Sequence, residues 1–254
     1  PLLKQIILKK NFKKIIFFYE AQPYQNKLIK ELRKMNVKAK TLGFYHSGLL
    51  PVHTSLVFRD GAPDRLLISG KFQKKYCEKY LGWPKSRVSD VPSFRYSKKN
   101  LLSDNGTIYL PYEISKPNII LDSLNVYLKK SKKKSLPLFK IKNHPAKLKS
   151  NKHRSLIIDI NKILKKNSIK FNNKINNTSI FIGSTTALIL ALEQKKEVIH
   201  ICEDPIFDSF SGKIWNNLLV SKIDNFVFKY KLKQNKHILN LINYNRNNFK
   251  TFLK

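Results

Sequence analysis

The sequence predicts an α/β protein with two domains built on parallel sheets. Short apolar runs of strand length alternate with segments of helical spacing, and this alternation occurs twice along the 254 residues. The length suits two domains of about 100–150 residues each. Hydrophobic residues make up 42% of the chain, which is enough for a folded core in each half despite the heavy charge.

The first half of the chain carries the signals of a β–α series. Apolar runs predict strands, and apolar residues spaced three and four apart predict helices. The expected strands are residues 13–20, 39–46 and 64–69, and the expected helices are residues 24–35 and 70–81. The second helix should end at Gly82-Trp83-Pro84, because glycine and proline stop helices. We therefore expect a first domain over residues 1–97, with one further β–α unit ahead of Pro1.

The second half repeats the alternation. The expected strands are residues 107–111, 136–142, 179–183 and 197–202, and the expected helices are residues 118–130, 154–166 and 185–194. These elements predict a second domain over residues 107–235, joined to the first near residues 97–106. Mixed helical spacing then predicts one or two closing helices over residues 236–254.

The chain is strongly basic. It has 43 lysines and 7 arginines against 16 acidic residues, for a formal net charge of +34. Three interpretations are open: a solvated lysine surface on an ordinary fold, contact with an anionic membrane, and nucleic-acid binding. The excess of lysine over arginine makes a nucleic-acid partner the less favoured of these, because nucleic-acid readers more often use the bidentate arginine fork.

The cysteines and the apolar runs bear on location. Cys77 and Cys202 are isolated, so they form neither a disulfide framework nor a cysteine metal motif, and a reducing compartment is expected. No apolar run reaches the ~18–20 residues that a membrane span requires. We expect a cytoplasmic protein, with peripheral attachment to the inner face of the cytoplasmic membrane as the alternative.

A candidate phosphate site follows the strand 179–183. There a buried strand turns through Gly183 into Ser184, Thr185 and Thr186, which open an apolar helix. The first turn of a helix offers backbone N–H groups and the positive end of its dipole, and this geometry suits a phosphate. The alternative is that Ser184 only caps its helix.

A histidine follows a second strand of the same domain. Asn143-His144-Pro145 comes directly after residues 136–142, so it should lie at the same carboxyl edge as Ser184, where ligands of open α/β sheets bind. A histidine there can donate a hydrogen bond to a phosphate oxygen, and the proline fixes the turn. The alternative is a histidine that only makes structural hydrogen bonds.

These segments resemble the donor half of two-domain GT-B glycosyltransferases, most nearly the bacterial sialyltransferase and Kdo-transferase type. The motifs are Lys142-Asn143-His144-Pro145 and Gly183-Ser184-Thr185-Thr186. In the first half, residues 19–24, 45–47 and 81–84 are similar to segments of surface-polysaccharide biosynthesis proteins of this class. The resemblance covers most of the chain and implies two Rossmann-like domains whose parallel sheets face a cleft.

The resemblance also implies roles for individual residues. It gives contacts with the donor nucleotide or its phosphate to Lys142, His144, Pro145, Gly183, Ser184, Thr185 and Thr186, and it puts Tyr112 and Glu113 near the base or ribose. Glu203 and Asp204, after the last expected strand, are candidates for ribose contacts or for a simple turn.

The catalytic base should come from the first domain. Glu20 ends the strand 13–20, where its carboxylate can take the proton of an acceptor hydroxyl, and His46 ends the strand 39–46 as the second candidate. An ion pair with a lysine, or a helix cap, is the alternative role of Glu20. The acidic-acidic-glycine motif that often carries the base in these families is absent at the equivalent position.

Neither a metal ion nor a cofactor is expected. His46 and His53 have no cysteine or acidic cluster at ligand spacing beside them, and the chain has no DxD, GxxxxGK[ST] or GxGxxG motif. The helix dipole, His144 and local lysines would stabilise the departing phosphate instead.

The expected function is therefore transfer of a sugar, of the nonulosonic (sialic-acid-like) or Kdo type, from a CMP donor to a surface polysaccharide or lipid-linked glycan. A GT-B enzyme that uses a UDP- or GDP-sugar is the alternative within this class. A basic nucleic-acid-binding protein and an inactive scaffold are the alternatives outside it.

Overall fold

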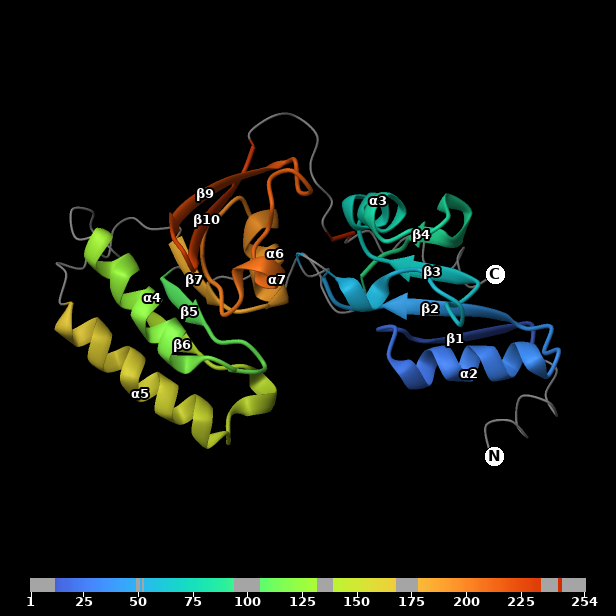
Figure 1. Cartoon of the computed structure of the whole chain (residues 1–254), viewed down its shortest axis with the longest axis horizontal. Helices are drawn as coiled ribbons and strands as arrows, with labels where there is room; N and C mark the ends of the chain where they lie inside the picture. Colours follow the sequence, from blue (N-terminus) through green and yellow to red (C-terminus); the bar gives the residue numbers. More distant parts are fainter. Residues whose placement is uncertain are drawn as a thin grey trace. The chain divides into compact units, whose positions relative to one another are not determined.

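The computed structural model describes residues 12–48, 51, 53–93, 106–131, 139–167, 178–233 and 242–243. The chain divides into two compact units, each with its own sheet (Figure 1). The first unit comprises residues 1–49, 53–100 and 238–254, and the second comprises residues 50–52 and 101–237. Both units are α/β, and the predicted class with parallel, Rossmann-like sheets is confirmed.

The first unit is built on four parallel strands in the order β1-β2-β3-β4. Its elements are β1 (Lys14–Phe18), α2 (Pro23–Lys34), β2 (Lys40–Tyr45), η1 (Thr54–Leu56), β3 (Arg65–Ile68), α3 (Lys71–Tyr80), η2 (Lys85–Arg87) and β4 (Val88–Asp90). The three strands and two helices that the sequence predicted are all present. The fourth strand was not predicted, because three residues are too few to show a period.

The buried face of helix α2 contains both apolar and polar residues. Ile29 and Leu32 are buried on it, and Pro23 stands in its first turn, where a missing N–H costs nothing. The same face buries Asn26, whose side-chain oxygen accepts a 2.8 Å hydrogen bond from the Tyr19 hydroxyl. The residue that follows β1 is thereby fixed against the helix.

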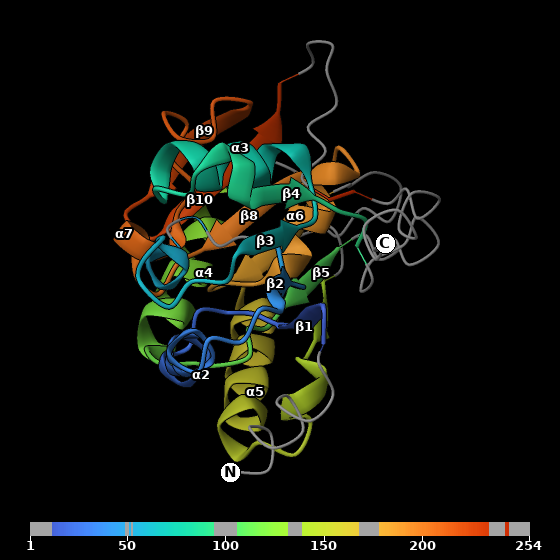
Figure 2. The same cartoon turned by 90° about the vertical axis from the view of Figure 1, so that its right-hand side faces the viewer.

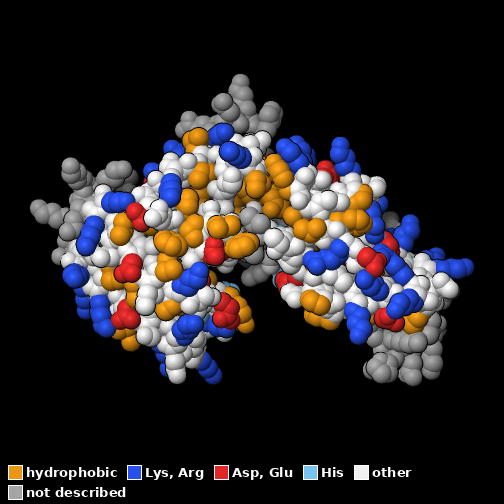
Figure 3. Space-filling view, in the orientation of Figure 1, with side chains coloured by type: hydrophobic (Ala, Val, Ile, Leu, Met, Phe, Trp, Pro, Cys, Tyr) orange, Lys and Arg blue, Asp and Glu red, His pale blue; other side chains and the backbone are white. Residues whose placement is uncertain are grey.

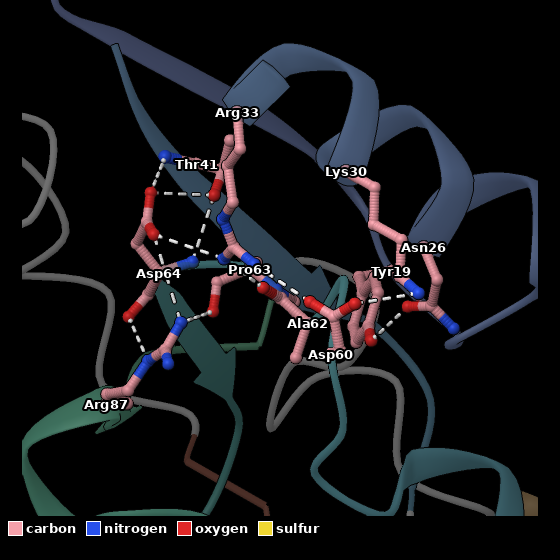
Figure 4. A network of polar contacts seen from close by, with 10 residues as sticks. All are labelled: Tyr19, Asn26, Lys30, Arg33, Thr41, Asp60, Ala62, Pro63, Asp64 and Arg87. Carbon is pink, nitrogen blue, oxygen red and sulfur yellow. Dashed lines mark hydrogen bonds and ion pairs between the residues drawn. The ribbon is translucent and has the colours of Figure 1, made fainter. Parts of the chain in front are cut away.

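A polar network ties α2 to the strands (Figure 4). One oxygen of Asp64 accepts hydrogen bonds of 2.8 Å from both the N–H and the hydroxyl of Thr41 in β2. Arg33 of α2 donates to the Ala62 carbonyl at 2.6 Å, and Arg87 donates to the Pro63 carbonyl at 2.7 Å. Burial by itself would raise the pKa of Asp64, but the Thr41 hydrogen bonds and the Arg33 guanidinium hold this pKa below its usual value. The network fixes the loop before β3 against β2.

The middle of β2 tolerates only a glycine. A Cβ at Gly43 would lie 2.7 Å from Pro63 Cγ and 2.8 Å from Tyr19 Cβ, both of which are closer than real contacts allow. We expect Gly43→Ala to lower the free energy of unfolding by about 1–3 kcal/mol, the usual cost of overpacking. Gly212→Ala is the matched control, because its Cβ would meet nothing closer than Val220 Cγ2 at 3.5 Å. Equal urea midpoints for the two variants would contradict this expectation.

The second unit has a six-stranded mixed sheet in the order β6-β5-β7-β8-β10-β9. Its elements are β5 (Thr107–Tyr109), α4 (Pro117–Lys130), β6 (Lys140–Lys142), η4 (Pro145–Lys147), α5 (Asn151–Lys166), β7 (Thr178–Ile182), α6 (Thr186–Glu193), β8 (Glu197–Ile201), α7 (Pro205–Asp208), β9 (Leu218–Asp224) and β10 (Val227–Leu232). The four predicted strands and three predicted helices are present. The hairpin of β9 and β10 was not predicted, and it adds two antiparallel strands to an edge of the parallel sheet.

Helices cover both faces of this sheet. Helices α4 and α5 lie together on one face in both views (Figures 1 and 2), where Ile120, Leu124 and Ile160 join the strand residues Ile108 and Ile180 in one core. Helix α6 packs against β8 and β10. The stacked rings of Tyr109 and Phe181, 4.8 Å apart, belong to the face opposite Ile108 and Ile180, because neighbouring residues of a strand point to opposite sides.

Part of the sequence predictions falls on residues outside the described ranges. This applies to most of the expected connection at residues 97–106 and to the closing helices over 236–254, of which only Ile242 and Asn243 are described. Asn243 belongs to the first unit: its carbonyl accepts from Ser93 N–H at 2.7 Å, and its side-chain amide donates to Asp90 at 3.3 Å. None of the helices in the described ranges is long and apolar enough to cross a membrane.

Candidate active site

The carboxyl edge of the second sheet gathers the residues predicted to hold a donor nucleotide. Strands β6, β5, β7 and β8 are parallel neighbours, so the segments that follow them lie along one edge. Tyr112 and Glu113 follow β5, His144 and Pro145 follow Lys142 at the end of β6, and Gly183, Ser184, Thr185 and Thr186 follow β7. This edge is where open α/β sheets bind ligands.

His144 lies against Tyr112 and has a defined tautomer. The two rings meet edge to face with centroids 5.2 Å apart. His144 Nδ1 accepts a 3.3 Å hydrogen bond from Ala146 N–H, and the backbone N–H of His144 donates to Asn143 Oδ1 at 2.8 Å. Because Nδ1 accepts, the neutral ring carries its proton on Nε2, which makes Nε2 a hydrogen-bond donor.

Lys147, which the sequence analysis did not single out, joins this cluster from η4. Its Nζ lies 2.7 Å from Glu113 Oε1 and 4.0 Å from the centre of the Tyr112 ring. The hydrogen bond with Lys147 lowers the pKa of Glu113, and the same contact raises the pKa of Lys147. Lys142 stands above the Tyr109 ring at 5.8 Å. Only packing of η4 against the loop after β5 brings these groups together, and sequence spacing does not show it.

The loop between β7 and α6 differs in detail from the expectation. Gly183 has a φ of 58°, a value that glycine adopts without strain, and a Cβ there would lie 3.4 Å from Pro111. The cap of α6 is Thr185, whose hydroxyl accepts from Ala187 N–H at 3.3 Å. The interpretation of Ser184 as the cap was therefore wrong. Ser184 instead donates to Asp208 Oδ1 at 2.8 Å.

A buried histidine of β8, His200, contacts the backbone of this loop. His200 Nε2 lies 2.9 Å from the Gly183 carbonyl, and His200 Nδ1 lies 3.4 Å from the Tyr230 hydroxyl. Burial lowers the pKa of His200 to about 4, so the ring is neutral at pH 7 and donates from Nε2 to Gly183. Tyr230 in turn accepts from Phe210 N–H at 3.1 Å. The sequence offered one signal for His200, a lone histidine inside an apolar strand.

The segment after β8 supplies carboxylates that bind backbone N–H groups. Glu203 Oε1 accepts from the N–H groups of Ser115 and Lys116, both at 2.8 Å, at the start of α4. Asp204 caps α7 by accepting from Ile206 N–H at 3.1 Å. The structure therefore gives Glu203 and Asp204 local roles at the starts of two helices.

The two base candidates of the first unit lie side by side. Glu20 follows β1 and His46 follows β2, its parallel neighbour, and Glu20 Oε1 is 3.8 Å from His46 Nε2. Both side chains are partly exposed, whereas His46 Nδ1 is buried without a hydrogen-bond partner among the described residues. The ring of Phe18 packs against His46 at 5.3 Å.

The turn that carries Glu20 is held in a strained shape. Ala21 has a φ of 58°, which is uncommon for a residue with a Cβ and tends to occur where function fixes the backbone. Gln25 Oε1 accepts from the N–H groups of Glu20 and Gln22, both at 3.0 Å, so Gln25 satisfies the start of α2. Glu20 is therefore not the helix cap, and its carboxylate faces His46.

His53 is a structural histidine. It is buried, and its two ring nitrogens lie 2.7 Å from the Tyr45 hydroxyl and 2.9 Å from the Ser55 hydroxyl. Within the described ranges, no group of three or more histidine, cysteine, aspartate or glutamate side chains could hold a metal ion.

Comparison with known proteins finds no relative of this chain. No protein-family model matches the chain, and neither a curated protein nor a solved structure matches it.

Proposed function

We propose that the chain is a metal-independent glycosyltransferase of the GT-B type that uses a CMP-activated sugar acid. The observation that carries the proposal is that His144 and Tyr112 are in contact and that they and the first turn of α6 follow neighbouring parallel strands at one carboxyl edge. In this proposal the second unit binds the donor and the first unit activates the acceptor.

The phosphate fits between His144 and α6. His144 Nε2 is a donor because Nδ1 already accepts from Ala146. In the first turn of α6, Ala187 N–H donates to the Thr185 hydroxyl and Leu188 N–H donates to the Thr185 carbonyl. Thr186 N–H makes no hydrogen bond within the helix, as is usual for the first helical residue. An anion there gains from this N–H and from the helix dipole.

The nucleoside fits beside Tyr112. This ring is 52% exposed, and Lys147 lies over it. An exposed aromatic ring next to the phosphate position gives a base a surface for stacking. Tyr112 is therefore the residue that we expect to contact the cytosine.

The reaction then needs one proton acceptor. The acceptor hydroxyl oxygen attacks the anomeric carbon, its proton passes to Glu20, the bond from that carbon to the phosphate oxygen breaks, and CMP leaves. His46 Nε2 lies 3.8 Å from Glu20 Oε1, beside the proposed base. His144 and α6 stabilise the negative charge that develops on the leaving phosphate.

The basic surface supports a membrane-bound acceptor. On the visible face, lysine and arginine side chains are spread over both units and form no single stripe (Figure 3). Such a surface suits the anionic inner leaflet, where each well-placed basic residue contributes about 1 kcal/mol. Nucleic-acid binding, by contrast, usually shows a concentrated basic stripe. We therefore propose a lipid-linked glycan or surface polysaccharide as the acceptor and a cytoplasmic, peripheral location.

A thermal-shift titration tests the donor site. CMP is expected to stabilise the wild type by about 2.7 kcal/mol at a concentration of 100 Kd. His144→Ala removes the donor to the phosphate, so we expect CMP to bind about 10- to 100-fold more weakly, the usual loss for a hydrogen bond to a charged group. His46→Gln is the matched control, because it removes a histidine of the other unit and should leave CMP binding unchanged.

Three results would contradict this assignment. Stabilisation by UDP or GDP in place of CMP would support the other nucleotide-sugar class. Stabilisation by a DNA duplex alone, lost in moderate salt, would support a polyanion-binding protein. Equal CMP binding by wild type and His144→Ala would remove His144 from the site.

A further inference from the structure

We infer that the Ser184 hydroxyl accepts a hydrogen bond from the nucleoside part of the bound nucleotide and does not bind the phosphate. The donor is either a ribose hydroxyl or the cytosine amino group. The inference rests on the proposed function, because it specifies how the nucleotide lies along the edge of the second sheet. It changes the role that the resemblance to sugar transferases implied for Ser184.

The Ser184 hydroxyl has one proton, and that proton is already used. Ser184 Oγ lies 2.8 Å from Asp208 Oδ1. A carboxylate can only accept, so Ser184 is the donor of this pair and presents only lone pairs to any further partner. A phosphate oxygen also presents lone pairs, and the two oxygens would repel. A hydroxyl or amino group of a ligand fits the same position.

Hydrogen bonds to both oxygens of Asp208 hold its carboxylate in place. Its Oδ2 oxygen accepts from Glu203 N–H at 3.1 Å and from Asp204 N–H at 3.0 Å. Two backbone donors thus fix the plane of the carboxylate and direct Oδ1 toward Ser184. The hydrogen bond between Ser184 and Asp208 is therefore part of a built network of three contacts.

The charge around Ser184 points the same way. Residues 203–208 carry the carboxylates of Glu203, Asp204 and Asp208. Glu203 accepts from a backbone N–H at the start of α4, and Asp204 and Asp208 accept from backbone N–H groups within residues 203–206. Backbone N–H groups that could attract a phosphate on this side are already bound by carboxylates. The phosphate is thus better accommodated toward His144 and Thr186, and the uncharged donor groups of the nucleoside toward Ser184.

Asp208→Asn provides a test without removing Ser184. The amide oxygen must stay on the side of Glu203 N–H and Asp204 N–H, so the amide NH₂ faces Ser184. The NH₂ group then donates to Ser184 Oγ, and the Ser184 proton turns toward the ligand. This variant should therefore weaken binding of a ligand that donates at this position, as Ser184→Ala does.

The experiment measures dissociation constants of CMP, cytidine, 2′-deoxy-CMP, 3′-deoxy-CMP and UMP for wild type, Ser184→Ala and Asp208→Asn. Ser209→Ala is the matched control, because it removes a nearby hydroxyl that donates to the Pro205 carbonyl. We expect Ser184→Ala to weaken CMP and cytidine by the same factor, about three- to tenfold for one hydrogen bond. For the one analogue that lacks the donor, Ser184→Ala and wild type should have equal dissociation constants. That analogue is a deoxynucleotide if the donor is a ribose hydroxyl, and UMP if the donor is the amino group.

Two outcomes would overturn the inference, and they are distinguishable from failure of the proposed function. If Ser184→Ala weakens CMP but leaves cytidine unchanged, Ser184 binds the phosphate. If no ligand distinguishes Ser184→Ala from Ser209→Ala, the Ser184 hydroxyl only holds the loop. Wild type that binds none of the five ligands would overturn the proposed function itself, and this inference with it.

Discussion

Lowering the pH from 7 to 4 is expected to remove about 3 kcal/mol of stability from each unit, through His53 in the first and His200 in the second. Burial lowers the pKa of each of these side chains to about 4 from an ordinary 6.5. A shift of one pKa unit corresponds to about 1.4 kcal/mol. The folded state therefore holds both rings neutral, and the unfolded chain protonates them first.

The direction of the effect follows from this difference in proton uptake. Between pH 6.5 and 4 the unfolded chain binds more protons at these two sites, so the free energy of unfolding falls as the pH falls. Above pH 6.5 both rings are neutral in both states, and their contribution is complete. The groups that face His200 are the Gly183 carbonyl, the Tyr230 hydroxyl and the Cys202 thiol. Asp208 opposes the lowering from a greater distance, but burial is the larger effect.

Urea unfolding at several pH values measures this effect. We expect His200→Gln and His53→Gln each to remove part of the loss between pH 6.5 and 4, because glutamine does not titrate. The glutamine amide can still donate to the Gly183 carbonyl in place of His200. A wild-type stability that is flat over this range, or variants with the same pH slope as wild type, would contradict the expectation.

The sequence was enough to predict which segments lie at the carboxyl edges of the two sheets, but it did not predict all of their strands. Apolar period and helix breakers identify each strand that carries a candidate residue. Parallel strands bring their carboxyl ends to one edge, so His144 was expected at the same edge as Ser184. The contact between Glu20 and His46 follows from the same geometry, but the sequence analysis did not predict it. The hairpin of β9 and β10 was missed although residues 228–232 alternate aromatic or apolar residues with lysine. The sequence analysis did not use this alternation of period two, which is typical of a β-strand.

The contacts that fix the site were not predictable from spacing. Ser184 and Asp208 are 24 residues apart, and Glu203 is 88 residues from the Ser115 N–H that it accepts from. Such pairs form only because α4, α6 and α7 begin at the same sheet edge. A serine before a helix is compatible with a cap or with a side-chain partner elsewhere, and only the position of Asp208 decides between them.

Glu20→Gln is expected to lower the rate of sugar transfer by about 10²- to 10⁴-fold, the range that a general base contributes. Glutamine keeps the size of the side chain and the turn held by Gln25, but it cannot take a proton. Binding of the CMP donor should be unchanged, since Glu20 belongs to the first unit and the nucleotide contacts are proposed in the second. The measurement is release of CMP from a CMP-sugar with and without an acceptor, reported as kcat and donor KM.

Two further variants show whether Glu20 or His46 removes the proton of the acceptor. Glu31→Gln is the control, because Glu31 lies on α2 with a carboxylate about as exposed as that of Glu20 and pairs with Lys34. His46→Gln removes the neighbour 3.8 Å from Glu20 and should cost less than Glu20→Gln if His46 only positions or polarises the carboxylate. A larger loss in His46→Gln than in Glu20→Gln would make His46 the base. A full rate in both variants would show that proton removal does not depend on this edge, and the acceptor would then have to be activated elsewhere.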